Sequence, residues 1–323
     1  MTAQIGIGAI HCLLPNDRTR VADLPELDLL NHEEARFALS SGIRTISVLD
    51  GHANAALAVA AVRGLGLAGS DRPDLLLLVA PRAPDVLLGS DAGQVQAEAG
   101  LSGTFAFTVD GLGCTGSSAA WAMARDLIVA DPGRTGAVIA HASRPAGVER
   151  VRYPVTVIGD GAYAMTIVRG GRPVLRAHRM ESDGRFHDLF QVDYRSAPWY
   201  EWREVCQSAE RYRFELAMHS RERLSRLVDE TLADVGIGKP DVAATLMQNV
   251  TARAFDFYET LLGLPIHSVC RRHLAEYGHL GAMDVVLNLW RLLADEPDLR
   301  RGDHVLVLNN SPVAAWAATL WEI

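Results

Sequence analysis

The feature that most constrains the fold of this chain is residues 104–130, TFAFTVDGLGCTGSSAAWAMARDLIVA. The stretch begins with an apolar, β-branched and aromatic run at residues 105–109, which predicts a buried strand. A glycine-rich turn follows, and the alanine-rich segment after it predicts a helix that Thr115, Ser117 or Ser118 can cap. A strand, a tight turn and a helix in this order are typical of α/β folds.

A cysteine, Cys114, occupies the turn directly before the predicted helix. The free amides and the positive dipole end of a helix stabilise a thiolate, so a cysteine at this place can be a nucleophile at neutral pH. The alternative is a small buried apolar residue, because free cysteines are among the most buried residue types. Position alone leaves both interpretations open.

The same turn also fits G-x-G-x-x-G from Gly111 to Gly116, which is the fingerprint of dinucleotide-binding proteins. That function needs an acidic residue about 20 positions later, at the end of the next strand, to hold a ribose. The next predicted strand, residues 136–142, ends in His141, Ala142 and Ser143 instead. The fingerprint is therefore incomplete, and dinucleotide binding is the weaker alternative.

The composition bounds the class of protein. The chain has 323 residues, 49% of them hydrophobic, which is enough for a large core or two domains. It has no apolar run of about 18 residues and no basic segment at its start, so we expect no membrane span and no signal peptide. The four cysteines are scattered, which favours a cytoplasmic location over disulfides or a metal site. A net charge of −8 argues against a nucleic-acid partner.

Apolar and helical patterns alternate along the whole chain and predict covered sheets. Strands are predicted at residues 4–10, 75–80, 105–109, 136–142, 155–170, 172–178, 243–247, 304–309 and 314–321, and helices at 54–66, 90–99, 210–235, 251–262 and 283–293. Each half ends in a strand, a turn broken by glycine or proline, and a final strand, which indicates a tandem duplication. Residues 180–208 form a polar and aromatic excursion typical of lids or partner surfaces.

Together these residues resemble the β-ketoacyl-acyl-carrier-protein synthase III group of the thiolase superfamily. The resemblance covers nearly the whole length through SDAGQVQAEAG (90–100), FTVDGLGCTG (107–116), IGDGAYA (158–164), EYGHLGAMD (276–284) and the closing GD-x-V-L-V-L strand with Trp316. It implies a five-layered αβαβα fold from two duplicated halves, which we place at residues 1–171, with the nucleophile, and 172–323. It also implies a homodimer.

In that family a cysteine takes an acyl group from a thioester, and histidine and asparagine side chains assist. Cys114 matches the cysteine. The family's His-Gln-Ala-Asn-x-Arg motif falls on residues 248–253, so Gln248 stands where histidine is expected, and His279 stands where the asparagine is expected. The resemblance thus implies an atypical catalytic set of Cys114, His279 and Gln248.

Two further positions follow from the resemblance. Arg253 keeps the arginine that in the family lies near the entrance for pantetheine and the carrier protein. Pro312 falls where the family uses a backbone N–H, together with that of the cysteine, here Cys114, to bind the oxyanion. Proline has no N–H, so we expect the oxyanion hole to lack one donor.

These departures favour an acyltransferase of secondary metabolism. It would take an acyl group from a CoA or carrier-protein thioester onto Cys114 and pass it to an acceptor, without a bound cofactor or metal. His279 is the predicted base, because a glutamine amide cannot exchange protons near neutral pH, and Gln248 would orient a carbonyl or acceptor. The alternatives are a decarboxylative condensing enzyme with modified catalytic residues and a non-catalytic partner subunit of a ketosynthase heterodimer.

Other polar residues receive no catalytic role from the sequence. Asp160 lies between two glycines and is predicted to be a turn residue, while His141 and Asp284 have no assignment. A set of arginines is expected mainly on solvated faces, some of them forming a basic rim for an acidic carrier protein: Arg144, Arg150, Arg152, Arg211, Arg213, Arg221, Arg223, Arg226 and Arg253.

Overall fold

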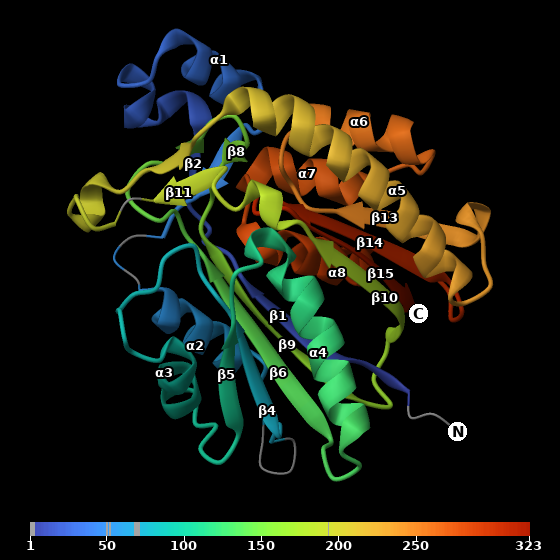
Figure 1. Cartoon of the computed structure of the whole chain (residues 1–323). Coiled ribbons are helices and arrows are strands. Elements are labelled where there is room, and N and C mark those ends of the chain that lie inside the picture. The colour runs from blue at the N-terminus through green and yellow to red at the C-terminus, as the bar shows by residue number, and fades with distance from the viewer. Residues whose placement is uncertain (1–3, 50, 52, 68–71, 193) are drawn as a thin grey trace.

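The computed structural model describes residues 4–49, 51, 53–67, 72–192 and 194–323 (Figure 1). Nine of the described strands form one sheet made of two parts, and the others form small two-stranded sheets. The first part holds β1 (Ile5–Leu13), β4 (Leu75–Val79), β5 (Phe105–Val109), β6 (Gly136–Ser143) and β9 (Gly161–Arg169). The second holds β10 (Val174–Ser182), β13 (Val242–Met247), β14 (His304–Ser311) and β15 (Ala315–Glu322).

Among the described strands, the two parts pair with each other only where β1 meets β10, through the residue pair Gly6 and Val174. Glycine is required there, because a Cβ on Gly6 would lie 2.2 Å from the carbonyl oxygen of Gly171. Along the rest of its length β1 pairs with β9. This single residue pair keeps the two parts in one sheet, and the rest of their strands can run in different directions.

Strand order and direction repeat between the two parts. The first has the order β5-β4-β6-β9-β1, with β4 parallel to β5 and β6 and the other pairs antiparallel. The second has the order β13-β14-β15-β10, with β13 parallel to β14 and the other pairs antiparallel, and Ile266 makes a parallel bridge to Thr245 in place of a fifth strand. The duplicated thiolase-like plan is confirmed, while the division at residues 171 and 172 stays a prediction.

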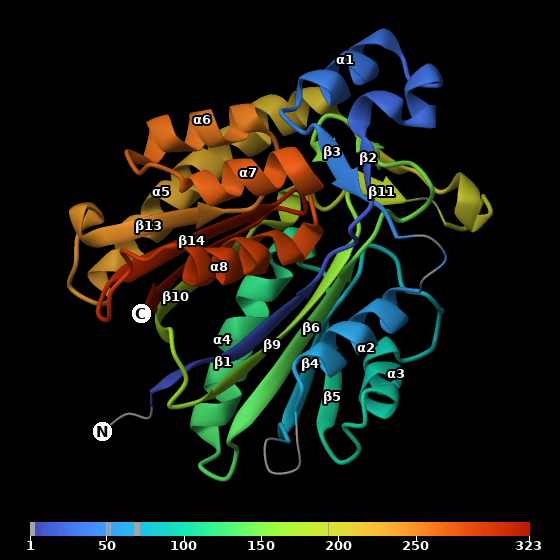
Figure 2. The same cartoon turned by 180° about the vertical axis from the view of Figure 1, so that it is seen from behind.

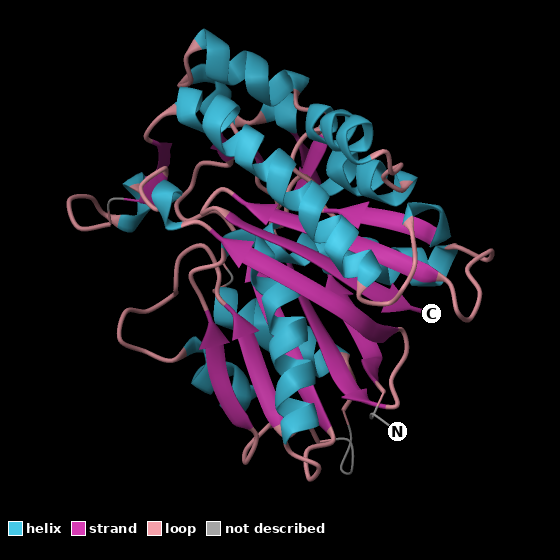
Figure 3. Ribbon diagram, turned by 45° about the vertical axis from the view of Figure 1, so that its right-hand side comes forward, coloured by secondary structure: helices cyan, strands magenta, loops and turns pink. Residues whose placement is uncertain are grey.

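Helices fill three layers around these strands, on both faces of the sheet (Figure 3). α2 (Asn54–Gly64) and α3 (Asp91–Glu98) pack on the first part, and α5 (Ala217–Ala233), with α6 (Ala252–Leu262) beside it, packs on the second. α4 (Gly116–Ala130) and α8 (Asp284–Asp295) lie between them (Figures 1 and 2). α4 contacts strands of both parts, β6 and β15 among them, which gives the expected five-layered αβαβα arrangement.

The inner layer is held by large buried aromatic residues. Trp121 of α4 and Trp321 of β15 are fully buried and meet edge to face, with ring centroids 5.4 Å apart. Such a pair adds about 0.5–1.5 kcal/mol beyond the burial of its area. It fixes α4, and with it the turn before α4, against the second part of the sheet.

Most predicted strands and helices are present with ends shifted by a few residues. The strand predicted at residues 155–170 is two strands, β8 (Thr156–Val157) and β9, and the helix predicted at 210–235 begins as a π-helix, Arg211–Leu216, before α5. The prediction of a buried strand at residues 105–109 is wrong in its burial, because only Val109 of β5 is buried. The sequence analysis missed α1 (His32–Ser40), although its N-terminus carries a capping box between Asn31 and Glu34. It also missed α7 (Ser268–Tyr277) and the hairpin of β11 (Phe190–Val192) and β12 (Glu204–Cys206) inside the 180–208 excursion. Among the described residues, no helix is long and apolar enough to cross a bilayer.

Candidate active site

Cys114 lies in a 3-10 turn, Gly113–Thr115, that joins the end of β5 to the start of α4. The turn is tight because Gly113 adopts a φ of +51° and a Cβ on it would lie 2.4 Å from the Ser311 Oγ. The Asn309 Nδ2 donates a hydrogen bond to the carbonyl oxygen of Cys114 at 2.8 Å. The end of β14 therefore holds the cysteine turn in place, and the Cys114 side chain is buried.

The predicted side-chain cap of α4 is wrong. No side chain caps this helix. The Ser117 Oγ instead donates to the carbonyl oxygen of Ala282 at 2.7 Å, and the Thr115 Oγ1 donates to that of Leu112. These hydroxyls are therefore engaged away from the first amides of α4.

The imidazole of His279 lies beside Cys114, with Nε2 3.1 Å from Sγ. His279 is fully buried on the segment between α7 and α8. Its backbone N–H donates to the Val157 carbonyl, and its carbonyl accepts from the Gly159 N–H, both at 3.0 Å. The glycine-rich segment before β9 thus fixes the histidine opposite the sulfur.

The other ring nitrogen of His279, Nδ1, lies 2.5 Å from Oδ2 of Asp284. Asp284 is the first residue of α8 and is fully buried. Its carboxylate also accepts backbone hydrogen bonds from Leu280 at 2.8 Å and Asn249 at 2.9 Å. The carboxylate therefore holds the proton on Nδ1 and directs Nε2 to the cysteine, a role the sequence analysis missed.

Cys114 and His279 each change the pKa of the other through electrostatic interaction. Burial alone would raise the pKa of the Cys114 thiol, but the adjacent His279 outweighs it, and Arg82 and Arg152 add to the lowering. Burial likewise opposes the charged form of His279, yet Asp284 and Cys114 raise its pKa to about 9. The lowered pKa of the thiol and the raised pKa of the imidazole both favour a thiolate–imidazolium pair.

The environment of Gln248 differs from that of Cys114 and His279. It is buried at the end of β13, and its Nε2 donates to the carbonyl oxygen of Asn310 at 3.1 Å. Within the described part of the chain its Oε1 has no hydrogen-bond partner. Gln248 lines neither of the two cavities that reach Cys114.

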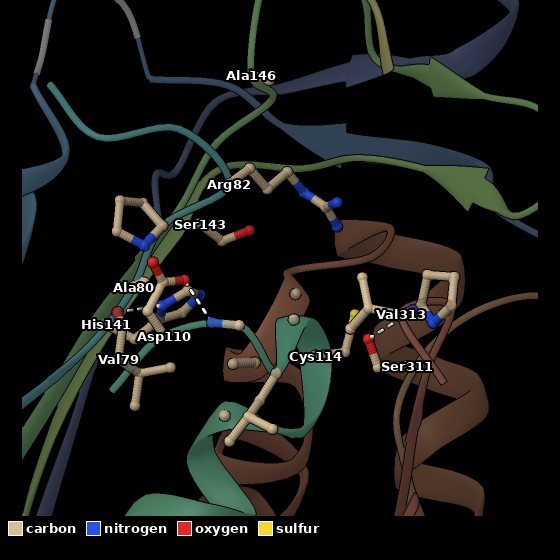
Figure 4. A pocket seen from close by; sticks show the side chains of 18 of the residues that line it. Val79, Ala80, Arg82, Asp110, Cys114, His141, Ser143, Ala146, Ser311 and Val313 are labelled. Carbon is tan, nitrogen blue, oxygen red and sulfur yellow. Dashed lines mark hydrogen bonds between the residues drawn. The ribbon is translucent and has the colours of Figure 1, made fainter. Parts of the chain in front are cut away.

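These two cavities meet at Cys114, Ser311 and Pro312. The first has a volume of about 340 Å³ and includes Arg253 and Arg213 in its wall. The second has a volume of about 210 Å³ and is shown in Figure 4. The structure therefore places Pro312 beside the sulfur and Arg253 on a cavity that leads to it.

Comparison with known proteins agrees with this architecture. The family model for the 3-oxoacyl-(acyl-carrier-protein) synthase III C terminal matches residues 232–323. A β-ketoacyl-(acyl-carrier-protein) synthase III of Rhodospirillum centenum is 27% identical over 98% of this chain and 97% of its own length. By these matches the chain is similar to the β-ketoacyl-acyl-carrier-protein synthase III family over nearly its whole length.

Solved structures share the fold at lower identity. The 3-oxoacyl-(acyl carrier protein) synthase III of Pseudomonas aeruginosa PAO1 has a TM-score of 0.80 at 21% identity, covering 99% of this chain and 98% of that chain. ChlB3, described as an acyltransferase, has a TM-score of 0.82 at 22% identity with the same coverage. These likenesses show a common fold.

As a synthase III-like protein, this chain has an unusual set of polar residues near the cysteine. The resemblance offered Cys114, His279 and Gln248 as a trio, and the geometry joins Cys114 and His279 to Asp284 instead. An acid five residues after the histidine, at the start of a predicted helix, was the available signal. Among the described residues, no group of three or more histidine, cysteine or acidic side chains could hold a metal ion.

The expectation of solvated arginines is wrong for Arg150 and Arg152. Arg150 binds both oxygens of the fully buried Asp160 at 2.9 Å, so Asp160 is more than a turn residue. The Asp160 backbone directly follows Gly159, which holds His279. Arg152 is buried beside the second cavity and pairs with Glu204.

Proposed function

We propose that this protein is an acyltransferase in which Cys114 accepts an acyl group from a CoA or carrier-protein thioester and passes it to an acceptor. The observation that carries the proposal is the continuous chain of contacts from the Cys114 Sγ to His279 and on to Asp284. The similarity to β-ketoacyl-(acyl-carrier-protein) synthases III supports a thioester of a carrier protein or of CoA as the donor.

The same relay can serve both halves of the transfer. The thiolate of Cys114 attacks the thioester carbonyl, and the imidazolium of His279 gives its Nε2 proton to the departing thiol. Neutral His279 then takes a proton from the acceptor as that acceptor attacks the acyl-cysteine. The C–S bond breaks, Cys114 leaves as a thiolate, and the thiolate–imidazolium pair is restored. Asp284 keeps the ring in one tautomer and stabilises the imidazolium, as the aspartate of a serine protease does.

The oxyanion formed in each half needs hydrogen-bond donors. We assign this role to the backbone N–H of Cys114. Pro312 lines the same cavity and has no N–H to donate, so its proposed place in the oxyanion hole would leave one donor missing. The next residue, Val313, lines the same cavity, and its N–H makes only a long contact of 3.4 Å with the Ser311 Oγ, so it is the second proposed donor.

Decarboxylative condensation is the second candidate. It needs side-chain donors that stabilise an enolate, and the Gln248 Nε2 is already engaged by Asn310. The interlocked Cys114, His279 and Asp284 suit proton transfer to and from an acceptor better. Similar folds include both an acyltransferase and a tetronic acid condensing enzyme. The intact relay also weighs against a non-catalytic partner subunit.

The proposed partners follow from two surfaces. Arg253 and Arg213, at the larger cavity, suit the acidic surface of a carrier protein.

The outer edge of β5, which pairs only with β4 among the described strands, carries Phe105 with 67% of its surface exposed. We propose that this edge joins two copies into a homodimer. Native mass spectrometry of the purified chain tests that assembly.

The acyl-enzyme is the direct test of the proposed activity. Intact-mass spectrometry after incubation with a panel of acyl-CoA donors should show one adduct on the wild type and none on Cys114→Ala. Cys206→Ala is the matched control, because Cys206 is half-buried and burial raises its pKa. Absence of an adduct with every donor, or an undiminished adduct in Cys114→Ala, would overturn the proposal.

A further inference from the structure

The smaller cavity beside Cys114 has charged groups in its wall. Arg82 and Arg152 both pair with Glu204, Arg82 through Nη1 at 3.2 Å and Arg152 through Nη2. The Arg82, Arg152 and Glu204 side chains are 13%, 4% and 18% exposed. Two buried guanidinium groups thus share one carboxylate. A pocket built only for a hydrocarbon chain would not contain such groups, because burying unpaired charge is costly.

Part of each guanidinium has no partner within the described residues. Nε and Nη2 of Arg82 and Nε of Arg152 are buried without a hydrogen bond. Nε and Nη2 form one edge of the guanidinium and present two parallel N–H groups, the geometry that binds a carboxylate with two hydrogen bonds. Because Nη1 is taken by Glu204, this edge of Arg82 stays available to the cavity.

Two more unpartnered polar atoms belong to the same cavity, Nε2 of His141 and Oγ of Ser143. Both would lie 3.4 Å from a Cβ on Gly281, which has none and adopts a φ of +61°. His141 Nδ1 lies 3.1 Å from the Val79 carbonyl and so carries the proton. In the view of Figure 4, His141 and Ser143 lie across the cavity from Cys114, with Arg82 above the space between them.

The charges of the cavity favour an anion. Glu204 neutralises one of the two guanidinium groups. Asp110 also lines the cavity, but it is exposed and its Oδ1 accepts from the backbone N–H of Gly111 at 2.6 Å. Burial lowers the pKa of His141 to about 4, which keeps it neutral. Once Cys114 is acylated and uncharged, the buried part of the wall therefore carries one uncompensated positive charge.

We propose that the acyl group held on Cys114 ends in a carboxylate, which binds the Nε–Nη2 edge of Arg82. The donor is then the monothioester of a dicarboxylic acid. This inference rests on the proposed acyl transfer and names its substrate class. Arg152 and Ser143 are positioning residues, the first by holding Glu204 against Arg82 and the second by closing the polar wall.

The test compares succinyl-CoA with butyryl-CoA, which have the same chain length and differ in the terminal carboxylate. Intact-mass time courses should show faster acylation by succinyl-CoA. Any effect of Arg82→Gln on the Cys114 thiol acts on both donors alike. The variant should therefore reduce the ratio of the succinyl rate to the butyryl rate by about 10- to 100-fold, the range for a lost hydrogen bond to a charged group. The matched control is Arg301→Gln, an exposed arginine, with circular dichroism confirming the fold of each variant.

The outcomes separate this inference from the proposed function. Equal rates for the two donors, or a succinyl preference that survives Arg82→Gln, would overturn the carboxylate site while leaving acyl transfer intact. A preference for 3-hydroxybutyryl-CoA over succinyl-CoA would show that the site binds a hydroxyl group rather than a carboxylate, and would also overturn the inference. No adduct with any donor would count against acyl transfer itself.

If no donor forms an adduct, a binding measurement still tests whether the cavity binds a carboxylate. Succinyl-CoA should raise the unfolding temperature of Cys114→Ala more than butyryl-CoA does, since a ligand stabilises the state that it binds. The difference should vanish when Arg82→Gln is added. Equal shifts in the presence of Arg82 would refute the inference.

Discussion

The Nδ1 atom of His279 lies 2.5 Å from Oδ2 of Asp284, on the side of the ring opposite Cys114. This contact decides which nitrogen carries the proton and therefore which one faces the sulfur. It also counters the effect of burial, so that the pKa of His279 is raised to about 9. The reactivity of Cys114 thus depends on a residue that no substrate needs to touch.

His279→Ala should lower turnover by about 10²–10⁴-fold, the usual contribution of a general base, with the fold intact by circular dichroism. Gln248→Ala should lose less, because its amide is bonded to Asn310 and does not line the cavities. Steady-state kinetics with the best donor measures both. If Gln248→Ala is the more impaired variant, the roles proposed here are wrong and a condensing enzyme is favoured.

Asp284→Asn should lower the pKa of His279, because burial then acts without the carboxylate that opposes it. In the wild type the imidazolium that protonates the leaving thiol is lost as the pH rises through about 9. In the variant we expect that loss at a lower pH, and a rate reduced by about 10²–10⁴-fold. The pH profile of acylation measures the shift.

The control for Asp284→Asn is Asp295→Asn, an exposed residue at the other end of the same helix. This control variant should lose acylation activity at the same alkaline pH as the wild type. An unchanged limb in Asp284→Asn would show that the carboxylate does not set the charge of His279.

Arg150→Met should destabilise the fold, because it leaves the fully buried Asp160 carboxylate without its two hydrogen bonds at 2.9 Å. Removing one partner of a buried pair costs about 3–5 kcal/mol. Arg176→Met, at a pair with Glu322 that is partly exposed, should cost about 0–1 kcal/mol. Urea unfolding compares the two, and similar midpoints would contradict the structural role of Asp160.

Arg253→Glu should lower kcat/KM for an acyl-carrier-protein donor by about tenfold or more at low salt, because like charges at a docking rim slow association. The same acyl group on pantetheine should react nearly as before, since Arg253 is an exposed residue in the wall of the larger cavity. An equal loss with both donors would place Arg253 in the binding of pantetheine rather than of the carrier.

The sequence predicted strands and helices best where a segment carries one clear pattern of apolar residues. The continuous apolar run of β4 is a strand buried on both faces, and the turn between β5 and α4 holds Cys114 as expected. α7 was missed because its buried residues share the helix with Arg271, Arg272 and Glu276, which mask its apolar face. Local patterns of this kind report burial only when the polar residues stay on the other face.

What the sequence determined by itself is the order of strands and helices, the duplicated plan and the position of the cysteine, because each follows from neighbouring residues. Only the tertiary structure decided the site. Cys114 and His279 are 165 positions apart, and Arg82 and Glu204 are 122 apart. Their contacts arise where α4, the segment before α8 and the β11–β12 hairpin converge. Without the full fold, Asp284 is one more acid at a helix start, and Arg82 and Arg152 are two more surface arginines.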